Sequence, residues 1–309
     1  MKDITTQKIV KGEKAKTFTK KIARQEFQRI IQYTDQDPAH KEKLEILDAS
    51  LCRYKDIYPY KHNIVKISNE HKMVNASWMN VINEKSFIAS QAPNDNTLDD
   101  FWQMCFEHNV THILMLCKEF EDNKKKCSNY WSTTTKFRDF IVNDCSLLKQ
   151  DDFIERKRII VTYIKEKPNI QKTFEHLQFK EWPDHSTPNI HNYVLIFEKL
   201  FKFADDAREA REESNNKKKI NNPILIHCSA GIGRTGVFLT LYAICNEIKK
   251  QINSQNSVDL IFNVFNFVRK LKEMRMFSVE NINQYNFIYK FLEQYLIERN
   301  VPPQLNNGN

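Results

Sequence analysis

Cys228 and Arg234 stand at the two ends of a short glycine-containing segment whose residue types suit the binding and attack of an anion. Residues 223–238 read PILIHCSAGIGRTGVF, which is an apolar run, a Cys-x5-Arg segment and a second apolar pattern. Its three glycines allow tight turns, so that successive backbone N–H groups can converge on one point. A helix predicted to begin near Arg234 directs the positive end of its dipole at the same point. The segment therefore predicts an anion-binding cradle between a buried strand and a helix.

Within such a cradle, Cys228 has the chemistry of a nucleophile. The helix dipole and the converging N–H groups favour the charged form of a thiol, so we expect a thiolate near neutral pH. Arg234 carries a planar fork that can bind two phosphate oxygens. A thiolate beneath a bound phosphate is an in-line nucleophile at phosphorus. We therefore predict a phosphocysteine intermediate.

Other interpretations of Cys228 are weaker on the same residues. A metal site needs clustered ligands at short spacing, and none lie near His227 and Cys228. A Walker-type nucleotide loop needs Gly-Lys-Ser/Thr, where this segment has Gly-Arg-Thr. An inert core cysteine would not require three glycines and an arginine. The nucleophile is favoured, and the alternatives stay open until the context of the loop is known.

The predicted elements place this loop inside an α/β domain. Helical periodicity is expected over residues 17–32, 97–108, 193–210, 235–250, 258–274 and 280–298, with Thr97 as an N-cap. Residues 111–117 and 223–228 read as buried strands, and short β-like pieces lie within 57–92. Three β-rich segments within 136–182 predict an antiparallel meander. We predict one domain with a twisted mixed β-sheet flanked by helices, and with the Cys-x5-Arg loop between a central strand and a helix.

Composition limits the class of protein without selecting a function. The 309 residues are 41% hydrophobic and 28% charged, which is enough apolar material for one large domain. The net charge of +8 is compatible with an anionic substrate, nucleic acid or an acidic membrane surface. Seven cysteines without a C-x-x-C pair predict reduced thiols and a cytosolic compartment. Neither a secretory signal nor an apolar run near the roughly 20 residues of a membrane helix is visible, so we expect a soluble protein without a membrane anchor.

HCSAGIGRTG resembles, over its whole length, the phosphate-binding loop of the phosphotyrosine-specific protein tyrosine phosphatase family. EWPDHSTP, residues 181–188, is similar to the mobile acid loop of that family, and RYKDIYPY, residues 53–60, to its substrate-recognition loop. HKMVNASW, FIASQAPNDNTLDDFWQM, EFEDNKKKCSNYW and NINQYNFIY resemble four further blocks in family order. The match runs from about residue 18 to residue 298. The resemblance implies a phosphatase that hydrolyses phosphotyrosine in proteins without a metal or a cofactor.

The resemblance also implies a role for each matched residue. Asp184 becomes the general acid that protonates the tyrosine leaving group, a phenolate with a pKa of about 10, and the base that later accepts a proton from water. Thr235 hydrogen-bonds the sulfur, Tyr54 stacks on the substrate ring, and Asp56 holds the substrate backbone. The other predicted substrate-binding residues are Glu121, Lys126, Trp182, His227, Ser229, Ala230, Gly231, Ile232, Gly233, Arg234, Glu280 and Gln284.

Four departures from the family pattern affect this interpretation. Glu280 stands where the family has the Gln that positions the hydrolytic water, so we predict that hydrolysis of the phosphocysteine is slowed by the added charge. Phe277 replaces a common Gly, which predicts a narrower pocket entrance. Leu51 and Cys52 replace Lys-Asn before the recognition loop, which leaves the peptide preference open, and Ala92 replaces a common Gly.

Three functions are therefore carried forward. The first is an active phosphotyrosine phosphatase in cytoplasmic signalling, with phosphotyrosine-containing proteins as partners and no nucleic acid. The second is a poorly active, substrate-trapping phosphotyrosine-binding module, because of Glu280. The third is a phosphatase of broader specificity, which the Tyr54 block opposes, since a phosphoserine is too short to reach Cys228 in a deep pocket.

The predicted domain boundaries are a flexible segment at 1–16, the tyrosine-protein phosphatase catalytic domain at 17–299 and a flexible tail at 300–309.

The richness in Asn, Lys and Ile looks similar to the phosphatases carried by polydnaviruses, and a ciliate or amoebal origin fits as well.

Overall fold

An eight-stranded mixed sheet forms the centre of the computed structural model, which describes residues 7–9, 20–68, 73–81, 86–182, 190–214, 222–254, 260–299 and 306–307. The strand order is β2-β3-β4-β11-β5-β10-β9-β8. The four central strands, β4, β11, β5 and β10, run parallel, and the outer strands pair antiparallel. The strands are β2 (Ile64–Lys66), β3 (Met73–Met79), β4 (Phe87–Ser90), β5 (His112–Met115), β8 (Phe140–Gln150), β9 (Ile154–Tyr163), β10 (Ile170–Phe179) and β11 (Ile224–His227).

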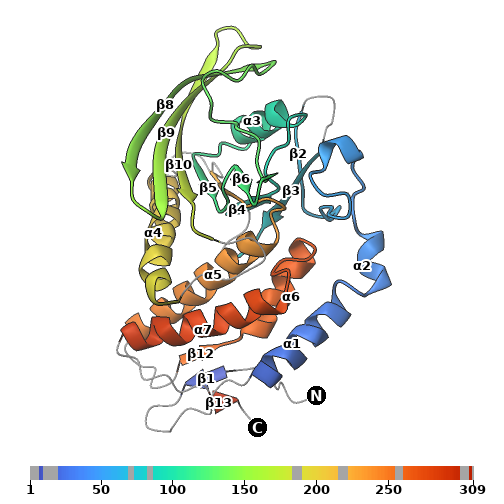
Figure 1. The fold of residues 1–309 in the computed structure, drawn as a ribbon, viewed down its shortest axis with the longest axis vertical. Coiled ribbons are helices and arrows are strands. Elements are labelled where there is room, and N and C mark those ends of the chain that lie inside the picture. Colours follow the sequence, from blue (N-terminus) through green and yellow to red (C-terminus); the bar gives the residue numbers. More distant parts are fainter. Residues whose placement is uncertain are drawn as a thin grey trace.

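Strand β11 lies in the middle of the sheet and carries the cysteine loop at its carboxyl end. Every residue of β11, β4 and β5 is buried, as expected for parallel strands that are covered on both faces. The predicted buried strands within 111–117 and 223–228 are confirmed. The meander is confirmed as well: β8, β9 and β10 pair antiparallel and extend as a long curved ribbon at the top of Figure 1.

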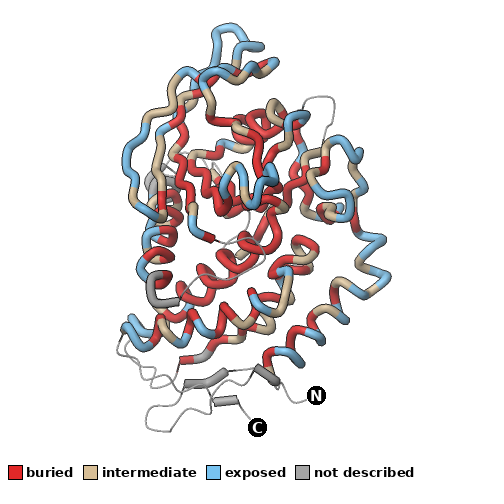
Figure 2. Tube along the Cα trace, viewed as in Figure 1, coloured by how far each residue is buried: buried red, intermediate tan, exposed pale blue. Residues whose placement is uncertain are grey.

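The helices pack on both sides of the central strands. In Figure 1, α3 lies across the sheet from the group formed by α5, α6 and α7. Helix α5 is buried on nearly all sides from Gly233 to Asn246, and Figure 2 shows it as one of the most continuously buried segments. The helices are α1 (Lys20–Tyr33), α2 (Pro38–Glu42), α3 (Leu98–Glu107), α4 (Ile190–Ser214), α5 (Gly233–Asn253), α6 (Val264–Met274) and α7 (Ile282–Glu298).

One local prediction is wrong in its bounds, and the Thr97 N-cap is confirmed in position only. The helix expected over 258–274 begins only at Val264, because Leu260–Phe262 form strand β12 and the Asn263 side chain caps the helix by accepting from Asn266 N at 2.9 Å. A run of three apolar residues fits either periodicity, so the sequence could not separate strand from helix there. Thr97 does precede α3, but its Oγ1 accepts from Asn94 N at 3.0 Å and makes no cap bond to the helix.

A second, three-stranded sheet lies next to α7 in Figure 1, and its order is β12-β1-β13. Strand β1 (Gln7–Ile9) and strand β13 (Asn306–Asn307) come from the two terminal segments, which the sequence predicted to be flexible. Both termini therefore contribute short strands, paired antiparallel through β1.

Helix α1 is held against α6 by a buried ion pair. Lys272 Nζ lies 2.7 Å from Asp35 Oδ2, and the side chain of Lys272 is fully buried. Burial lowers the pKa of Lys272, and the adjacent Asp35 opposes that shift. On the neighbouring face, the Glu26 carboxylate accepts hydrogen bonds from Tyr285 and Tyr289 of α7. The ion pair and these hydrogen bonds thus hold α1 against α6 and α7.

We expect Asp35→Asn to lower the free energy of unfolding by about 3 kcal/mol, because it leaves the Lys272 charge buried beside a neutral amide. Urea denaturation measures the change. The double variant Asp35→Asn/Lys272→Met is the control, and it should recover most of the loss, since no buried charge remains. A loss below about 1 kcal/mol in the single variant would contradict this account.

Candidate active site

The cysteine loop spans residues 228–232, between the end of β11 and the start of α5. Gly231 has a φ of +71°, which L-residues rarely adopt, and a Cβ at this position would collide with the Ser90 carbonyl. Its N–H donates to Cys228 Sγ at 3.3 Å. The sulfur is thus held against a backbone donor, close to the N-terminus of α5.

Cys228 lines a solvent-open cavity. Three other loop residues and six residues from outside the loop line it, namely Ser229, Ala230, Ile232, Gly233, Arg234, Tyr54, Ile57, Glu280 and Gln284. Cys228 is buried, with only 3% of its surface exposed. The structure therefore brings together predicted residues from three distant parts of the chain.

Arg234 is held in place by Glu121 of strand β6 (Phe120–Glu121). Its two terminal nitrogens donate to the two carboxylate oxygens at 2.6 and 2.8 Å, and one also donates to the Trp182 carbonyl at 3.1 Å. Burial opposes the charge of Arg234, but the bonds to Glu121 and the nearby Cys228 raise its pKa overall. The guanidinium is therefore a fixed cation behind the cavity.

Strands β6 and β7 (Lys124–Lys125) form the hairpin that carries Glu121. Asp122 and Asn123 both have positive φ in its two-residue turn, as the favoured hairpin turn requires. The predicted position of Glu121 beside the catalytic loop is the one found in the structure.

Arg275 supports the loop from below, and sequence reasoning missed it. This fully buried side chain donates to the carbonyls of Gly231 at 2.7 Å and Ala230 at 3.0 Å. The C=O and N–H groups of a trans peptide point to opposite sides. Since the carbonyls of these two loop residues point at Arg275, the N–H groups of the residues that follow them point away from it. Burial lowers the pKa of Arg275 to about 10, so the side chain is still protonated at neutral pH.

His227 lies behind the loop and not in the cavity where we expected it to bind substrate. Its Nδ1 lies 3.0 Å from the Cys228 carbonyl, and its Nε2 lies 2.8 Å from the Tyr130 hydroxyl. The same hydroxyl lies 2.8 Å from His176 Nε2. Burial lowers the pKa of His227 to about 4, so the imidazole is neutral at physiological pH. His227 therefore positions the base of the loop.

The predicted hydrogen bond from Thr235 to the sulfur is not formed. Thr235 Oγ1 is buried in the first turn of α5 without a hydrogen-bond partner among the described residues, and the Gly231 N–H is the donor that reaches Sγ. Asp184 lies outside the described residues. Trp182, two positions before it, is buried with its ring 5.6 Å from that of Phe197.

Tyr54 forms one wall of the cavity, and its hydroxyl lies 2.9 Å from Ser229 Oγ. Ser229 Oγ in turn donates to the carbonyl of Lys126, a predicted site residue that is itself buried. Asp56, the predicted backbone clamp, is exposed next to Tyr54 and does not line the cavity.

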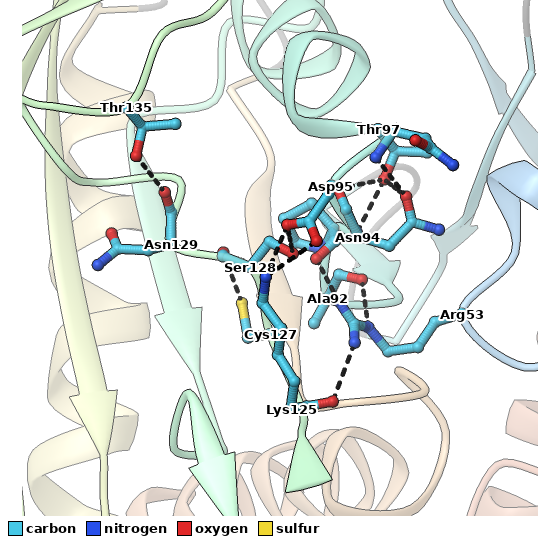
Figure 3. Close-up of polar contacts among 12 residues, drawn as sticks. Arg53, Ala92, Asn94, Asp95, Thr97, Lys125, Cys127, Ser128, Asn129 and Thr135 are labelled. Carbon is cyan, nitrogen blue, oxygen red and sulfur yellow. Dashed lines mark hydrogen bonds and ion pairs between the residues drawn. The ribbon is translucent and has the colours of Figure 1, made fainter.

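Arg53 anchors the segment that carries Tyr54. Its guanidinium donates to the carbonyls of Ala92 at 3.0 Å, Lys125 at 3.2 Å and Pro93, as Figure 3 shows in part. In the same cluster, Asp95 accepts from Lys125 Nζ and Ser128 Oγ, each at 2.7 Å. These contacts join the segment that carries Tyr54 to the β6–β7 hairpin.

Glu280 and Gln284, from the start of α7, converge on Gly233, the first residue of α5. Gln284 Oε1 accepts from Glu280 N at 2.9 Å. A Cβ on Gly233 would lie 2.7 Å from Gln284 Nε2 and 3.0 Å from Glu280 Oε2. Phe277, with a φ of +56°, packs into the same apolar cluster as Ile57 at the cavity rim.

A parallel central strand, a glycine turn and a helix N-terminus surround one thiol here, and this is the arrangement of a phosphate-binding cysteine site on an α/β fold. Comparisons with known proteins identify the family within that class. The family model of the protein-tyrosine phosphatases matches residues 48–294, and the chain belongs to that family.

Individual relatives agree with the family model. Tyrosine-protein phosphatase non-receptor type 20 of Rattus norvegicus is 30% identical over 83% of this chain and 56% of its own length. Receptor-type tyrosine-protein phosphatase C of Homo sapiens is 32% identical over 90% of this chain and 21% of its own. The catalytic domain of human protein tyrosine phosphatase non-receptor type 18 superposes with a TM-score of 0.68 at 26% identity, over 89% of this chain and 96% of that one. The chain thus spans about half or less of these curated relatives, but nearly all of that catalytic domain.

Three further findings concern the cysteines, the helices and possible metal-binding clusters. All seven cysteines are free thiols. Within the described ranges, no helix has the length and apolar character needed to cross a membrane. In those same ranges, no three His, Cys, Asp or Glu side chains gather as a metal site.

Proposed function

We propose that this protein hydrolyses phosphotyrosine in proteins through a phosphocysteine intermediate on Cys228. The observation that carries the proposal is the position of Cys228 Sγ at the base of a cavity, against a loop N–H and beside the fixed cation of Arg234. Family membership supports the reaction class.

The proposed reaction has two steps. Phosphate oxygens bind the N–H groups of the loop and Arg234, and the thiolate attacks phosphorus as the bond to the tyrosine oxygen breaks. Asp184 gives its proton to that oxygen. Its placement near the phosphate is supported by Trp182, two residues earlier, whose carbonyl binds Arg234. Water then attacks phosphorus, the P–S bond breaks, and inorganic phosphate leaves with the thiolate restored.

The cavity supports tyrosine over serine as the phosphorylated residue. Tyr54 and Ile57 give it an apolar wall above Cys228, which suits an aromatic ring between the peptide backbone and the phosphate. A solved structure with a TM-score of 0.71 is titled PTPN18 in complex with HER2 phosphopeptides, and this supports phosphotyrosine-containing proteins as partners here. Because the nucleophile must stay reduced, we propose a reducing, cytoplasmic site of action.

Phosphate release from matched phosphotyrosine and phosphoserine peptides, with p-nitrophenyl phosphate as a third substrate, tests this function. We expect turnover of the phosphotyrosine peptide and of p-nitrophenyl phosphate, and loss of peptide turnover in Asp184→Ala. Equal turnover of both peptides would favour the broader-specificity phosphatase. Tight phosphotyrosine binding without turnover would favour the substrate-trapping module, the second candidate, which the carboxylate of Glu280 in the cavity supports.

We expect Glu280→Gln to accelerate hydrolysis of the phosphocysteine about three- to tenfold, because it removes a negative charge beside the phosphoryl group. Rapid mixing with p-nitrophenyl phosphate should give a burst of nitrophenol equal to the enzyme concentration, followed by a slow phase that is faster in the variant. Glu293→Gln, an exposed site further along α7, is the charge-matched control. The absence of a burst would rule out a rate limit at this step, and an unchanged slow phase would rule out an effect of Glu280 on it.

A further inference from the structure

Two buried histidines and a tyrosine form a hydrogen-bonded chain behind the cysteine loop. His176 on β10, Tyr130 after β7 and His227 at the end of β11 are all fully buried. The Tyr130 hydroxyl lies 2.8 Å from Nε2 of His176 and 2.8 Å from Nε2 of His227. Nδ1 of His227 in turn lies 3.0 Å from the Cys228 carbonyl. Hydrogen bonds therefore connect β10 with the peptide group of the proposed nucleophile.

The Cys228 carbonyl determines where the protons of this chain lie. A carbonyl only accepts, so Nδ1 of His227 carries the proton of that hydrogen bond. Burial lowers the pKa of His227 to about 4, so the ring is neutral and its Nε2 has a lone pair in place of a proton. Nε2 must then accept the single proton of the Tyr130 hydroxyl. This bond therefore runs from Tyr130 to His227.

His176 must donate to the same hydroxyl oxygen from its other side. With its proton on His227, Tyr130 presents only lone pairs to Nε2 of His176. Burial lowers the pKa of His176 well below its ordinary value, so this ring is also neutral and its Nδ1 has no proton. In agreement, Nδ1 has no hydrogen-bond partner among the described residues, where an N–H would be left without an acceptor. The Met115 sulfur, 3.9 Å from the hydroxyl, is a weaker acceptor than a ring nitrogen.

The donor on His176 decides which way the Tyr130 proton points. A hydroxyl proton can rotate toward either neighbour, and an Nε2 without a proton on His176 would compete for it. Because His176 donates, His227 is the ring that accepts, and its own N–H stays on the Cys228 carbonyl. The C=O and N–H groups of a trans peptide point to opposite sides, so the Ser229 N–H points away from His227.

We propose that His176 is a positioning residue of this site: its Nε2–H directs the Tyr130 proton to His227, and this holds the peptide between Cys228 and Ser229 with its N–H available to phosphate. The inference rests on the proposed function, because it concerns the phosphate that this function transfers. His176 does not line the cavity, so its effect must pass through the tyrosine and the second histidine.

Two substitutions of His176 separate its donor from its bulk. His176→Gln keeps a side-chain N–H donor, and His176→Leu removes it. We expect His176→Leu to lower kcat/KM for p-nitrophenyl phosphate about three- to tenfold, and to weaken competitive inhibition by inorganic phosphate by a similar factor, because one hydrogen bond that orients the loop is lost. His176→Gln should bring both quantities back to within about twofold of the original. Equal losses in the two variants would overturn the proposal.

The matched control is His112→Leu, which removes another buried neutral imidazole from the neighbouring strand β5. The His112 ring bonds the Thr111 hydroxyl and is not part of the chain to the loop. Activity per folded molecule in this variant should stay within about twofold of the original, and thermal unfolding reports any loss of fold in each variant. A loss in His112→Leu as large as that in His176→Leu would mean that buried imidazoles matter only for packing, which would contradict the positioning role.

The effect of His176 is expected to depend on the Tyr130 hydroxyl. In a Tyr130→Phe background, His176→Leu should change kcat/KM and phosphate inhibition by less than about twofold more, since the link to His227 is already absent. A further loss of the same size as in the original protein would show that His176 acts by another route, and the proposal would be wrong.

Nitrogen NMR of the unmodified protein, labelled at its nine histidines, reads the proton positions without any variant that must keep its fold. A ring nitrogen that carries a proton resonates far from one that does not. We expect the proton of His227 on Nδ1 and that of His176 on Nε2, with His176→Gln identifying the signals of the latter. A proton on Nδ1 of His176 would overturn the proposal.

The proposed function and this inference fail separately. Turnover of p-nitrophenyl phosphate that is equal in the original protein and in folded His176→Leu overturns only the inference. If no substrate is turned over, the proposed function fails, and calorimetric binding of inorganic phosphate to the same variants decides the inference. Weaker phosphate binding in His176→Leu than in His176→Gln then supports it, and equal affinities overturn it.

Discussion

A Cys228→Ser variant is expected to lose phosphotyrosine-peptide turnover by about 10⁴-fold or more, while it still binds the peptide. The hydroxyl is nearly the size of the thiol, so the loop, the Arg275 contacts to it and the cavity keep their shape. Its oxygen, however, is not ionised at neutral pH, because a hydroxyl is a much weaker acid than a thiol, so it is a far weaker nucleophile. Phosphate release and calorimetric binding, compared in one preparation, separate the two effects.

The control for this variant is a cysteine of the same kind without the cradle. Cys245 lies on α5, and burial raises its pKa to about 12, so it remains a protonated thiol. Activity per folded molecule in Cys245→Ser should stay within about twofold of the original, because this thiol does not contact the cavity. A Cys228→Ser enzyme that keeps more than a tenth of the turnover would exclude Cys228 as the nucleophile.

Arg234→Lys is expected to lower kcat/KM about 10²- to 10³-fold, although the charge is kept. The guanidinium binds both oxygens of Glu121 and the Trp182 carbonyl in one plane, and a phosphate must be bound by the same fork. A Lys ammonium is a point charge that cannot hold two parallel hydrogen bonds to an anion and remain fixed to Glu121. Steady-state kinetics with p-nitrophenyl phosphate measure the loss without any peptide contribution.

Glu121→Gln is the matched variant on the other side of this pair. It keeps the shape and one acceptor oxygen, so Arg234 stays near its position but is held less firmly, and a loss of about tenfold is expected. Thermal unfolding of both variants shows whether the fold is retained, because each changes a buried contact. If Arg234→Lys lost less activity than Glu121→Gln, Arg234 would not be the phosphate ligand.

The anion-binding cradle could be predicted from the sequence alone, because its parts are adjacent in sequence. Cys228, the glycine turn and Arg234 lie within seven residues, so residue type and spacing alone predict a thiol under an anion site. The buried strands and the meander were predictable for a similar reason, since the spacing of apolar residues along a strand indicates whether it is buried on one face or on both. The short β12 was not, because three apolar residues carry no period.

Contacts between distant segments were beyond that reasoning. Arg275 reaches the Gly231 carbonyl across 44 positions, and nothing near Arg275 in the sequence indicates that its fork turns under the loop. The buried imidazole of His227 was expected at the substrate and instead lies behind the loop against Tyr130, and burial keeps it neutral there. Thr235 was expected to reach the sulfur, and the start of α5 at Gly233 placed its hydroxyl elsewhere.

By itself, then, the sequence predicted the proposed nucleophile, the cradle and the α/β elements around them, since these depend on short spacings and on the residue types that local geometry requires. The family resemblance had pointed to Glu121, Tyr54 and Glu280, but only the tertiary structure decided which groups they contact, and it alone added Arg275 beneath the loop. The physical reason is that hydrogen bonds and ion pairs act over a few ångströms in space, and their distance along the chain has no bearing on their strength.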